Sequence, residues 1–303
     1  MKKIVMTFCL AVLAIGVMAL PTQAGILDSL QAYWDYDGDG NDSSSKGNDA
    51  NLTQGAIDYV SEGLISGGQV VQVTEQPSVT SALYGEGFNH DITNEVTWTG
   101  WTKIVTNDGA GKGGFGVGNG LGAADANGAG KLHWRYKSPQ LAPSVWHFSH
   151  VPYNNSLGPA AAYMHRTDTN SEEVQPYEVG VWQFGALRVD TAGNVDFYVG
   201  REGQDDLIKV TPTAVIDDYQ GLDTTAWDTG VFRTAYYYTR GADVGIVQGD
   251  EAAIFSAALS DGDIEAIYDN NLAGNRLDQI PEPATLGLLS VGALLILGRR
   301  RRI

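Results

Sequence analysis

The stretch VWQFGALRVDTAGNVDFYVG, residues 181–200, decides the fold of this chain. Val and Phe, which favour extended backbone, occur in both halves of the stretch, with Trp182 in the first half and Tyr198 in the second. Between the halves lies TAGN, residues 191–194, whose Gly and Asn suit a tight turn. The stretch therefore predicts an antiparallel β-hairpin.

Other segments extend the strand pattern to the rest of the chain. KLHWRYK, residues 131–137, alternates polar and apolar residues without a break. Its Leu132, Trp134 and Tyr136 would face a core, because side chains two apart in a strand share one face. Further strand candidates are residues 95–105, 231–238 and 244–255.

One short amphipathic helix is expected near the C-terminal end. Ser260 is a suitable N-cap, and Asp263 three residues later completes a capping box. Leu259 and Ile264 can form a hydrophobic staple around the cap. Gly274 suits the residue that stops the helix.

Many strands at short spacing with a single short helix predict an all-β fold. The expected architecture is a two-sheet antiparallel β-sandwich of the jelly-roll type with one short C-terminal helix. About 250 residues lie between the two chain ends, enough for one all-β domain or two small ones. We expect a signal peptide at 1–24, a sandwich at 25–277, a linker at 278–283 and a transmembrane segment with an Arg-rich end at 284–303.

Three segments, in order along the chain, resemble the LamG-like, concanavalin A-type jelly-roll family. They are LQAYWDY (30–36) with the loop DSS (42–44) and GNDANL (47–52), the hairpin at 181–200, and GDEAAIFSAALSDGDIEAIY (249–268). The resemblance implies a β-sandwich and a role in binding glycan or matrix polymer. Residues 106–131 and 138–178 match the family only loosely.

The N-terminal end has the three regions of a secretory signal peptide. Lys2 and Lys3 form a positive start, residues 4–20 are apolar, and Thr22 and Ala24 offer small residues for cleavage after Ala24 by signal peptidase. A retained anchor is the alternative. The single cysteine, Cys9, lies in the apolar region, so the mature protein would contain no disulfide.

The C-terminal end combines a Pro-Glu-Pro triplet, an apolar run and a basic terminus. Residues 284–298 carry no charge; as a helix they would span about 22 Å, short of the roughly 30 Å hydrocarbon core. Terminal arginines can extend the span by snorkelling and place that end in the cytoplasm. A plain membrane anchor is one interpretation of this arrangement.

The same tail closely resembles the bacterial PEP-CTERM sorting segment. The residues that carry the resemblance are Pro281, Glu282, Pro283, Arg299, Arg300, Arg301 and Arg302. The resemblance implies that an exosortase-type membrane transpeptidase recognises and removes the tail. The protein would first be anchored in the inner membrane and then reach the cell surface or an extracellular polymer matrix.

Charge limits the partners of the body. The whole chain has 36 acidic and 19 basic residues; Lys2, Lys3 and the four terminal arginines are six of the basic ones, and Glu282 is one of the acidic ones. The remainder has 35 acidic and 13 basic residues, a net charge of −22. Such a charge disfavours nucleic acid and anionic membrane surfaces and attracts divalent cations.

The segment DYDGDGND, residues 35–42, predicts a Ca²⁺ site, because alternate carboxylates supply oxygen ligands and glycines permit a tight turn. Lys46 stands where an EF-hand loop needs a glutamate, so an EF-hand is not expected. The family resemblance suggests a structural Ca²⁺ near Asp42 and Asn48 instead, with Asp250 or Glu251 contributing. The candidate ligands are Asp37, Asp39, Asp42, Asn48 and Asp250; a solvated acidic turn is the alternative.

Trp101 is the candidate for stacking on a sugar. It breaks the parity of Val96 and Trp98, so it would lie outside the core, exposed in a groove. No E-x-D-x-x-E catalytic strand occurs in the sequence, and Asp261, Asp263 and Glu265 lie on the predicted helix, where the helix dipole explains them.

These observations favour an exported, surface- or matrix-targeted β-sandwich without enzymatic activity. It would bind carbohydrate or polymer, or serve as a structural matrix component. A carbohydrate-active enzyme on the same fold and a protein-binding adhesin are the alternatives.

Overall fold

The fold is taken from a computed structural model. It describes residues 25–64, 68–74, 81–106, 112–118, 132–137, 145–150, 163–166, 178–215, 231–238 and 245–280. Contacts divide the chain into two compact units, and the larger, Leu30–Ile280, contains both sheets. The smaller unit contributes a single described helix, the 3₁₀ turn η1 (Ile26–Ser29). The predicted signal helix and the C-terminal transmembrane helix lie outside the described residues. Within the described ranges, no helix has the length and apolar character needed to span a membrane.

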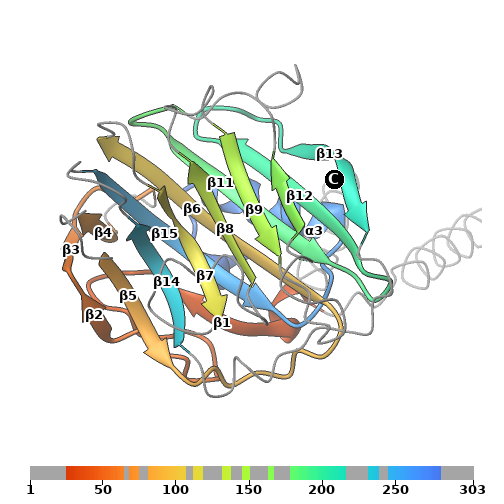
Figure 1. The fold of residues 1–303 in the computed structure, drawn as a ribbon, viewed down its shortest axis with the longest axis horizontal. Coiled ribbons are helices and arrows are strands. Elements are labelled where there is room, and N and C mark those ends of the chain that lie inside the picture. Colours follow the sequence, from red (N-terminus) through yellow and green to blue (C-terminus); the bar gives the residue numbers. More distant parts are fainter. Residues whose placement is uncertain are drawn as a thin grey trace, which may run out of the picture. The chain divides into compact units, whose positions relative to one another are not determined.

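Two antiparallel sheets build the larger unit (Figure 1). The first, sheet A, has the strand order β13 (Ile208–Val215), β12 (Asn194–Arg201), β11 (Trp182–Val189), β6 (Val96–Thr106), β15 (Ile246–Phe255), β4 (Val70–Thr74) and β3 (Ala56–Val60). Strand β1 (Leu30–Trp34) also pairs with β15, beyond the end of β4.

The second, sheet B, has the order β10 (Tyr163–Arg166), β9 (Val145–His150), β8 (Leu132–Lys137), β7 (Lys112–Gly118), β14 (Val231–Tyr238), β5 (Ser81–Glu86) and β2 (Leu52–Gln54). The predicted all-β, two-sheet antiparallel sandwich with one short C-terminal helix is confirmed. The side chains of β8 are not described, so the predicted inward direction of Leu132, Trp134 and Tyr136 stays a prediction.

The hairpin predicted from residues 181–200 is β11 and β12. The strands pair from Gln183 opposite Arg201 to Val189 opposite Val195. Asp190 closes the turn: its backbone N–H donates to Asn194 O, and its carboxylate accepts from the N–H groups of Ala192 and Asn194 at 2.9 Å each. The turn residues thus supply their own hydrogen-bond partners, as the sequence predicts.

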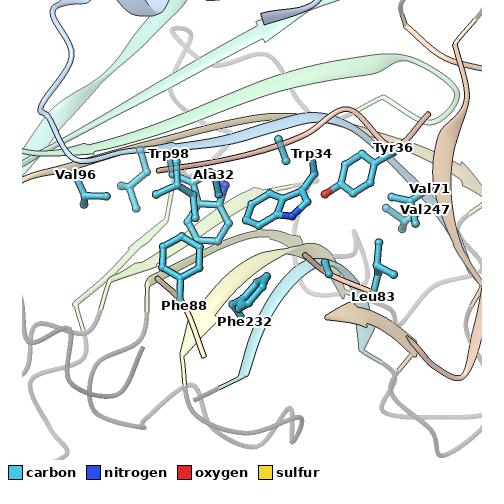
Figure 2. Packing of buried hydrophobic residues seen from close by; sticks show 14 of the residues in the cluster. Ala32, Trp34, Tyr36, Val71, Leu83, Phe88, Val96, Trp98, Phe232 and Val247 are labelled. Atoms are coloured by element: carbon cyan, nitrogen blue, oxygen red, sulfur yellow. The ribbon is translucent and has the colours of Figure 1, made fainter. Parts of the chain in front are cut away.

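Between the two sheets lies an apolar layer, which we call the inner core. Trp34 of β1 stacks on Phe232 of β14 with ring centroids 5.7 Å apart, and Phe88 meets Phe232 edge-on at 5.3 Å. Figure 2 shows these rings with Trp98 and Val96 of β6. The Trp34 indole N–H donates to Asn48 O at 2.8 Å, so the ring is buried without losing its hydrogen bond.

The opposite face of sheet A is covered by helix α3 (Asp261–Leu272) and the 3₁₀ turn η3 (Leu277–Gln279). We call this contact layer the outer layer. The predicted capping box is confirmed, since Ser260 Oγ accepts from Asp263 N and the Asp263 carboxylate accepts from Ser260 N. Tyr268 packs against Gly200 of β12, where any Cβ would collide with the tyrosine ring. Sheet A is therefore buried on both faces, and β6 and β15 are almost continuously buried.

Candidate functional site

The acidic loop after β1 is organised around the carboxylate of Asp42. Oδ1 accepts from the backbone N–H of Tyr33 at 2.9 Å and of Ser44 at 2.8 Å. Oδ2 accepts from Ser44 Oγ and from Asn48 N at 2.7 Å each. A carboxylate has about four acceptor positions, and all four are occupied by donors of the loop and of β1.

This arrangement does not fit a Ca²⁺ ligand. Asp42 and Asn48 do come together, as the sequence predicts, but N–H and O–H groups point at the oxygens that a cation would need. Asn48 is used in the same way: its Oδ1 accepts from Asn89 N, and its Nδ2 donates to the carbonyls of Gln31 and Asn89. The pair holds the loop to the start of β1 and to the turn after β5.

The other candidate ligands have separate partners. Asp37 forms an ion pair with Arg276, Asp39 accepts from Asn41, and Asp250 accepts from Leu64 N at 3.0 Å. Across the part of the chain that the structure describes, no three acidic, histidine or cysteine side chains form a group that could hold a metal. These contacts do not bring all five candidate ligands together, and the Ca²⁺ site stays a prediction.

A β-bulge in β15 places two neighbouring carboxylates on the outer face of sheet A. Asp250 is opposite Trp101 of β6 and Ala253 is opposite Thr99, so β15 advances three residues while β6 advances two. The extra residue is Glu251, whose φ of 50° lies in the left-handed region that side chains rarely adopt. Asp250 is 2% exposed and Glu251 is 3% exposed.

Glu251 is bonded to three elements: strand β1 and the two helices of the outer layer, α3 and η3. Both of its carboxylate oxygens lie 2.8 Å from the hydroxyl of Tyr33 in β1. Oε2 also accepts from Leu277 N of η3 at 3.0 Å and from Asn271 Nδ2 of α3 at 3.3 Å. Among the described residues, no basic side chain pairs with it.

Burial shapes the protonation of this pair. It raises the pKa of Glu251 to about 8, against the lowering effect of the Tyr33 and Leu277 hydrogen bonds. Burial and the neighbouring Glu251 carboxylate likewise hold the pKa of Asp250 well above its usual range. A proton is thus retained at these positions where an exposed carboxyl would be ionised.

The last described residues before the Pro-Glu-Pro triplet are fastened to the start of the sandwich. Arg276 Nη1 lies 3.1 Å from Asp35 Oδ2, and its Nη2 contacts Asp37. Leu277 is 1% exposed. Asn270 Nδ2 donates to Arg276 O at 2.8 Å, which ties the end of α3 to the same segment.

Trp101 does not lie in a groove, so its prediction as an exposed sugar platform is wrong. The parity argument places it correctly on the outer face of sheet A. There it is fully buried, stacked on Tyr268 with centroids 5.5 Å apart and an interplanar angle of 11°. Its Nε1 donates to Asn271 Oδ1 at 3.1 Å. Helix α3 covers the outer face of sheet A, where the sequence predicts that Trp101 is exposed.

The acidic start of α3 is also paired within the fold. Arg188 of β11 donates to Asp261 at 2.7 Å and forms an ion pair with Asp196, while the Tyr198 hydroxyl donates to Asp261 at 2.7 Å. The Tyr198 hydrogen bond and Arg188 hold the pKa of Asp261 below its usual value. The Asp261 side chain therefore holds the start of α3 against β11 and β12, a structural role that agrees with the helix-dipole argument.

Sequence reasoning missed the roles of Arg276 and Glu251. A signal for Glu251 was present, because two carboxylates in the otherwise apolar strand β15 must be buried or bulged. No comparable signal marks Arg276, whose partners Asp35 and Asp37 lie about 240 residues away in the sequence.

The C-terminal segment matches the PEP-CTERM protein-sorting motif over residues 279–302. This finding confirms the predicted motif and indicates export with a membrane-anchored C-terminal sorting signal. Its residues Pro281, Glu282, Pro283 and Arg299–Arg302, like the predicted cleavage position Ala24, lie outside the described part of the structure. No curated protein sequence matches the chain.

Among solved structures, the sandwich is similar to receptor-binding domains of botulinum neurotoxins. The binding domain of neurotoxin DC in complex with rat synaptotagmin II has 12% identity and a TM-score of 0.50, over 81% of this chain and 52% of that one. The serotype D binding domain has 14% identity and a TM-score of 0.51 over the same shares. The serotype D/C VPI 5993 binding domain has 12% identity and a TM-score of 0.51, over 81% and 53%.

At these identities the similarity shows the fold alone. The chain spans about half the length of the structures it matches.

Proposed function

We propose that this protein is a LamG-like binding or structural module that an exosortase-type enzyme delivers to the cell surface or the extracellular matrix. The observation that carries the proposal is the position of the sorting motif. The motif match begins at residue 279, and the compact sandwich unit ends at Ile280. A complete folded module is thus followed directly by its sorting signal.

A binding role is favoured over catalysis by the state of the acidic side chains. The adjacent carboxylates of Asp250 and Glu251 are buried, with Glu251 bonded to η3 and Asp250 to the backbone of Leu64, so neither is open to a substrate. Asp261 is paired with Arg188 and Tyr198. The similar solved structures are, by their titles, binding domains.

The ligand class that we propose is a neutral glycan or exopolysaccharide. The LamG-like resemblance supports a glycan, and the net charge of −22 outside the tails disfavours an anionic polymer. A protein ligand, as for an adhesin, is the second candidate, because one similar structure is described as a complex with synaptotagmin II.

The delivery part is tested by expressing the full chain in a host that has an exosortase and in the same host with that gene deleted. We expect a shortened form at the surface in the first host and full-length protein in the membrane fraction of the second. The variant Glu282→Ala should behave in the first host as the natural chain does in the second. Equal mass and location in both hosts would contradict the proposal.

The binding part is tested with the surface form on a glycan array, alongside a hydrolysis screen on the same glycans. We expect retention on a subset of neutral glycans without turnover. Turnover that a single carboxylate substitution abolishes would establish the enzyme alternative instead. Binding only to surface proteins would favour the adhesin.

A further inference from the structure

The end of the folded chain is held by two independent anchors. Residues 270–280 include the end of α3 and η3, and Pro281 of the sorting motif follows directly. One anchor is the buried Glu251 carboxylate, and the other is the ion pair of Arg276. The first attaches this segment to β15 and β1, and the second attaches it to the loop after β1.

The first anchor is a buried acceptor with donors from three elements. Tyr33 Oη, Asn271 Nδ2 and Leu277 N all donate to the Glu251 carboxylate. Leu277 N also lies 3.3 Å from Tyr33 Oη. If η3 leaves, Glu251 and Tyr33 both lose a partner inside a buried site, and a buried polar group without a partner destabilises the open state.

The second anchor is electrostatic and partly exposed. The Arg276 guanidinium bridges Asp35 and Asp37, one on each side of Tyr36 in the loop after β1. A fork of N–H donors that meets two carboxylates holds both the position and the orientation of the segment. Together the anchors keep η3 against the first strand of the sandwich.

We propose that Glu251, Asn271, Arg276 and Leu277 form a C-terminal clamp that holds residues 273–280 against the sandwich and thereby limits cleavage of the sorting motif by the exosortase-type enzyme. The inference rests on the proposed function. With the clamp closed, the folded unit ends at Ile280, one residue before Pro281.

Opening the clamp would lengthen the junction. Residues 273–280 follow α3, and eight extended residues reach about 26–29 Å. A membrane protease that binds its substrate in an extended form gains that distance from the bulk of the sandwich. Clamp opening should therefore accelerate processing, and a closed clamp should restrain it.

The test uses the full chain with the substitutions Arg276→Gln and Glu251→Ala, and with Glu178→Gln as the matched control. Glu178 forms an ion pair with Arg201 at 3.2 Å, away from the clamp. Two quantities are measured: hydrogen exchange of residues 273–280 in the purified precursor, and the rate of conversion from precursor to mature form by pulse-chase in the exosortase-containing host.

We expect at least tenfold faster exchange of residues 273–280 in both clamp variants, with the amides of β11 and β12 unchanged. Conversion should be about threefold faster or more, and the control should match the natural chain in both measurements. Faster exchange with unchanged or slower conversion would overturn the proposal, as would unchanged exchange in Arg276→Gln. If Glu251→Ala fails to fold, Arg276→Gln decides, because the Arg276 side chain is partly exposed at the surface of the clamp.

The failure of the proposed function looks different. In that case the natural chain itself would not be converted, or its conversion would not depend on the exosortase. The clamp variants would then have no conversion to accelerate, whatever their exchange rates.

Discussion

The two faces of sheet A are packed in different ways. The inner core is a layer of aliphatic and aromatic side chains that includes Trp34, Phe88 and Phe232. The outer layer has an aromatic stack of its own, Trp101 on Tyr268, but mixes it with the Glu251 carboxylate and the Asn271 amide.

The difference separates two tasks of the sheet. The inner core depends chiefly on apolar contact, which stabilises in proportion to the area removed from water, and its polar atom Trp34 Nε1 has a partner in the fold. The outer layer must also position one particular segment, the end of the chain, and hydrogen bonds with a fixed direction do this better than apolar contact. We therefore attribute global stability to the inner core and control of the C-terminal junction to the outer layer.

The largest expected effect comes from damaging the inner core. Trp34→Ala removes the ring that stacks on Phe232 and leaves Asn48 O without its donor. The free energy of unfolding should fall by about 3–5 kcal/mol. Urea unfolding followed by circular dichroism would measure it, and a loss below 1 kcal/mol would contradict the central place of Trp34.

Damage to the outer layer should cost somewhat less. Trp101→Ala should lower the free energy of unfolding by about 3 kcal/mol, because α3 can settle toward the gap and recover part of the contact. Since Trp101 is buried, glycan binding by the folded variant should not change. Lost binding with unchanged stability would restore the sugar-platform hypothesis that the structure contradicts.

The pH dependence of stability distinguishes the layers further. The pKa of Glu251 is about 8 in the folded protein and near 4.5 when unfolded, so the folded state binds more protons between these values. Stability from this group is therefore present at low pH and is lost as the pH rises toward and past 8. We expect the free energy of unfolding to fall by about 2 kcal/mol between pH 6 and pH 8.

A matched variant isolates that effect. Glu251→Gln should remove the share of the slope that Glu251 contributes and leave the share of Asp250, whose pKa is also raised. Asp261→Asn should leave the whole slope intact, because the pKa of Asp261 is lowered and it titrates in the acid range. Denaturant titrations at several pH values provide the measurement. A stability that rises from pH 6 to pH 8 would show that Glu251 is ionised in the fold.

The smallest effects concern the acidic loop. Asp42→Asn should lower the free energy of unfolding by about 1–2 kcal/mol, because an amide nitrogen cannot accept the hydrogen bonds that one carboxylate oxygen now receives. Urea unfolding would measure the loss.

Adding EDTA should leave the melting temperature of the natural protein unchanged. A melting temperature that falls by several degrees with EDTA and recovers with Ca²⁺ would support the predicted calcium site.

Much of the inner architecture could be predicted from the sequence because it depends on local patterns. The hairpin at β11 and β12 follows from its apolar strands and its turn residues, and the α3 cap follows from Ser260 and Asp263. The alternation in β6 also places Trp98 inside and Trp101 on the other face.

The outer layer could not be predicted in the same way because it depends on contacts between distant segments. Parity says which face Trp101 occupies, but not that α3, some 160 residues later, covers it. Likewise, the spacing of the acidic residues suggests Ca²⁺ as the partner of Asp37. In the folded chain its partner is the guanidinium group of Arg276. Such pairings depend on topology and leave no periodic trace in the sequence.

The most direct test of the account is the intact mass of the surface form, with its C-terminal peptide identified. The account predicts a C-terminus after Ile280 and before the apolar run of the tail, with α3 and η3 complete and residues 299–302 removed. A surface form that still ends at Ile303, or one cut within the sandwich before residue 277, would contradict it.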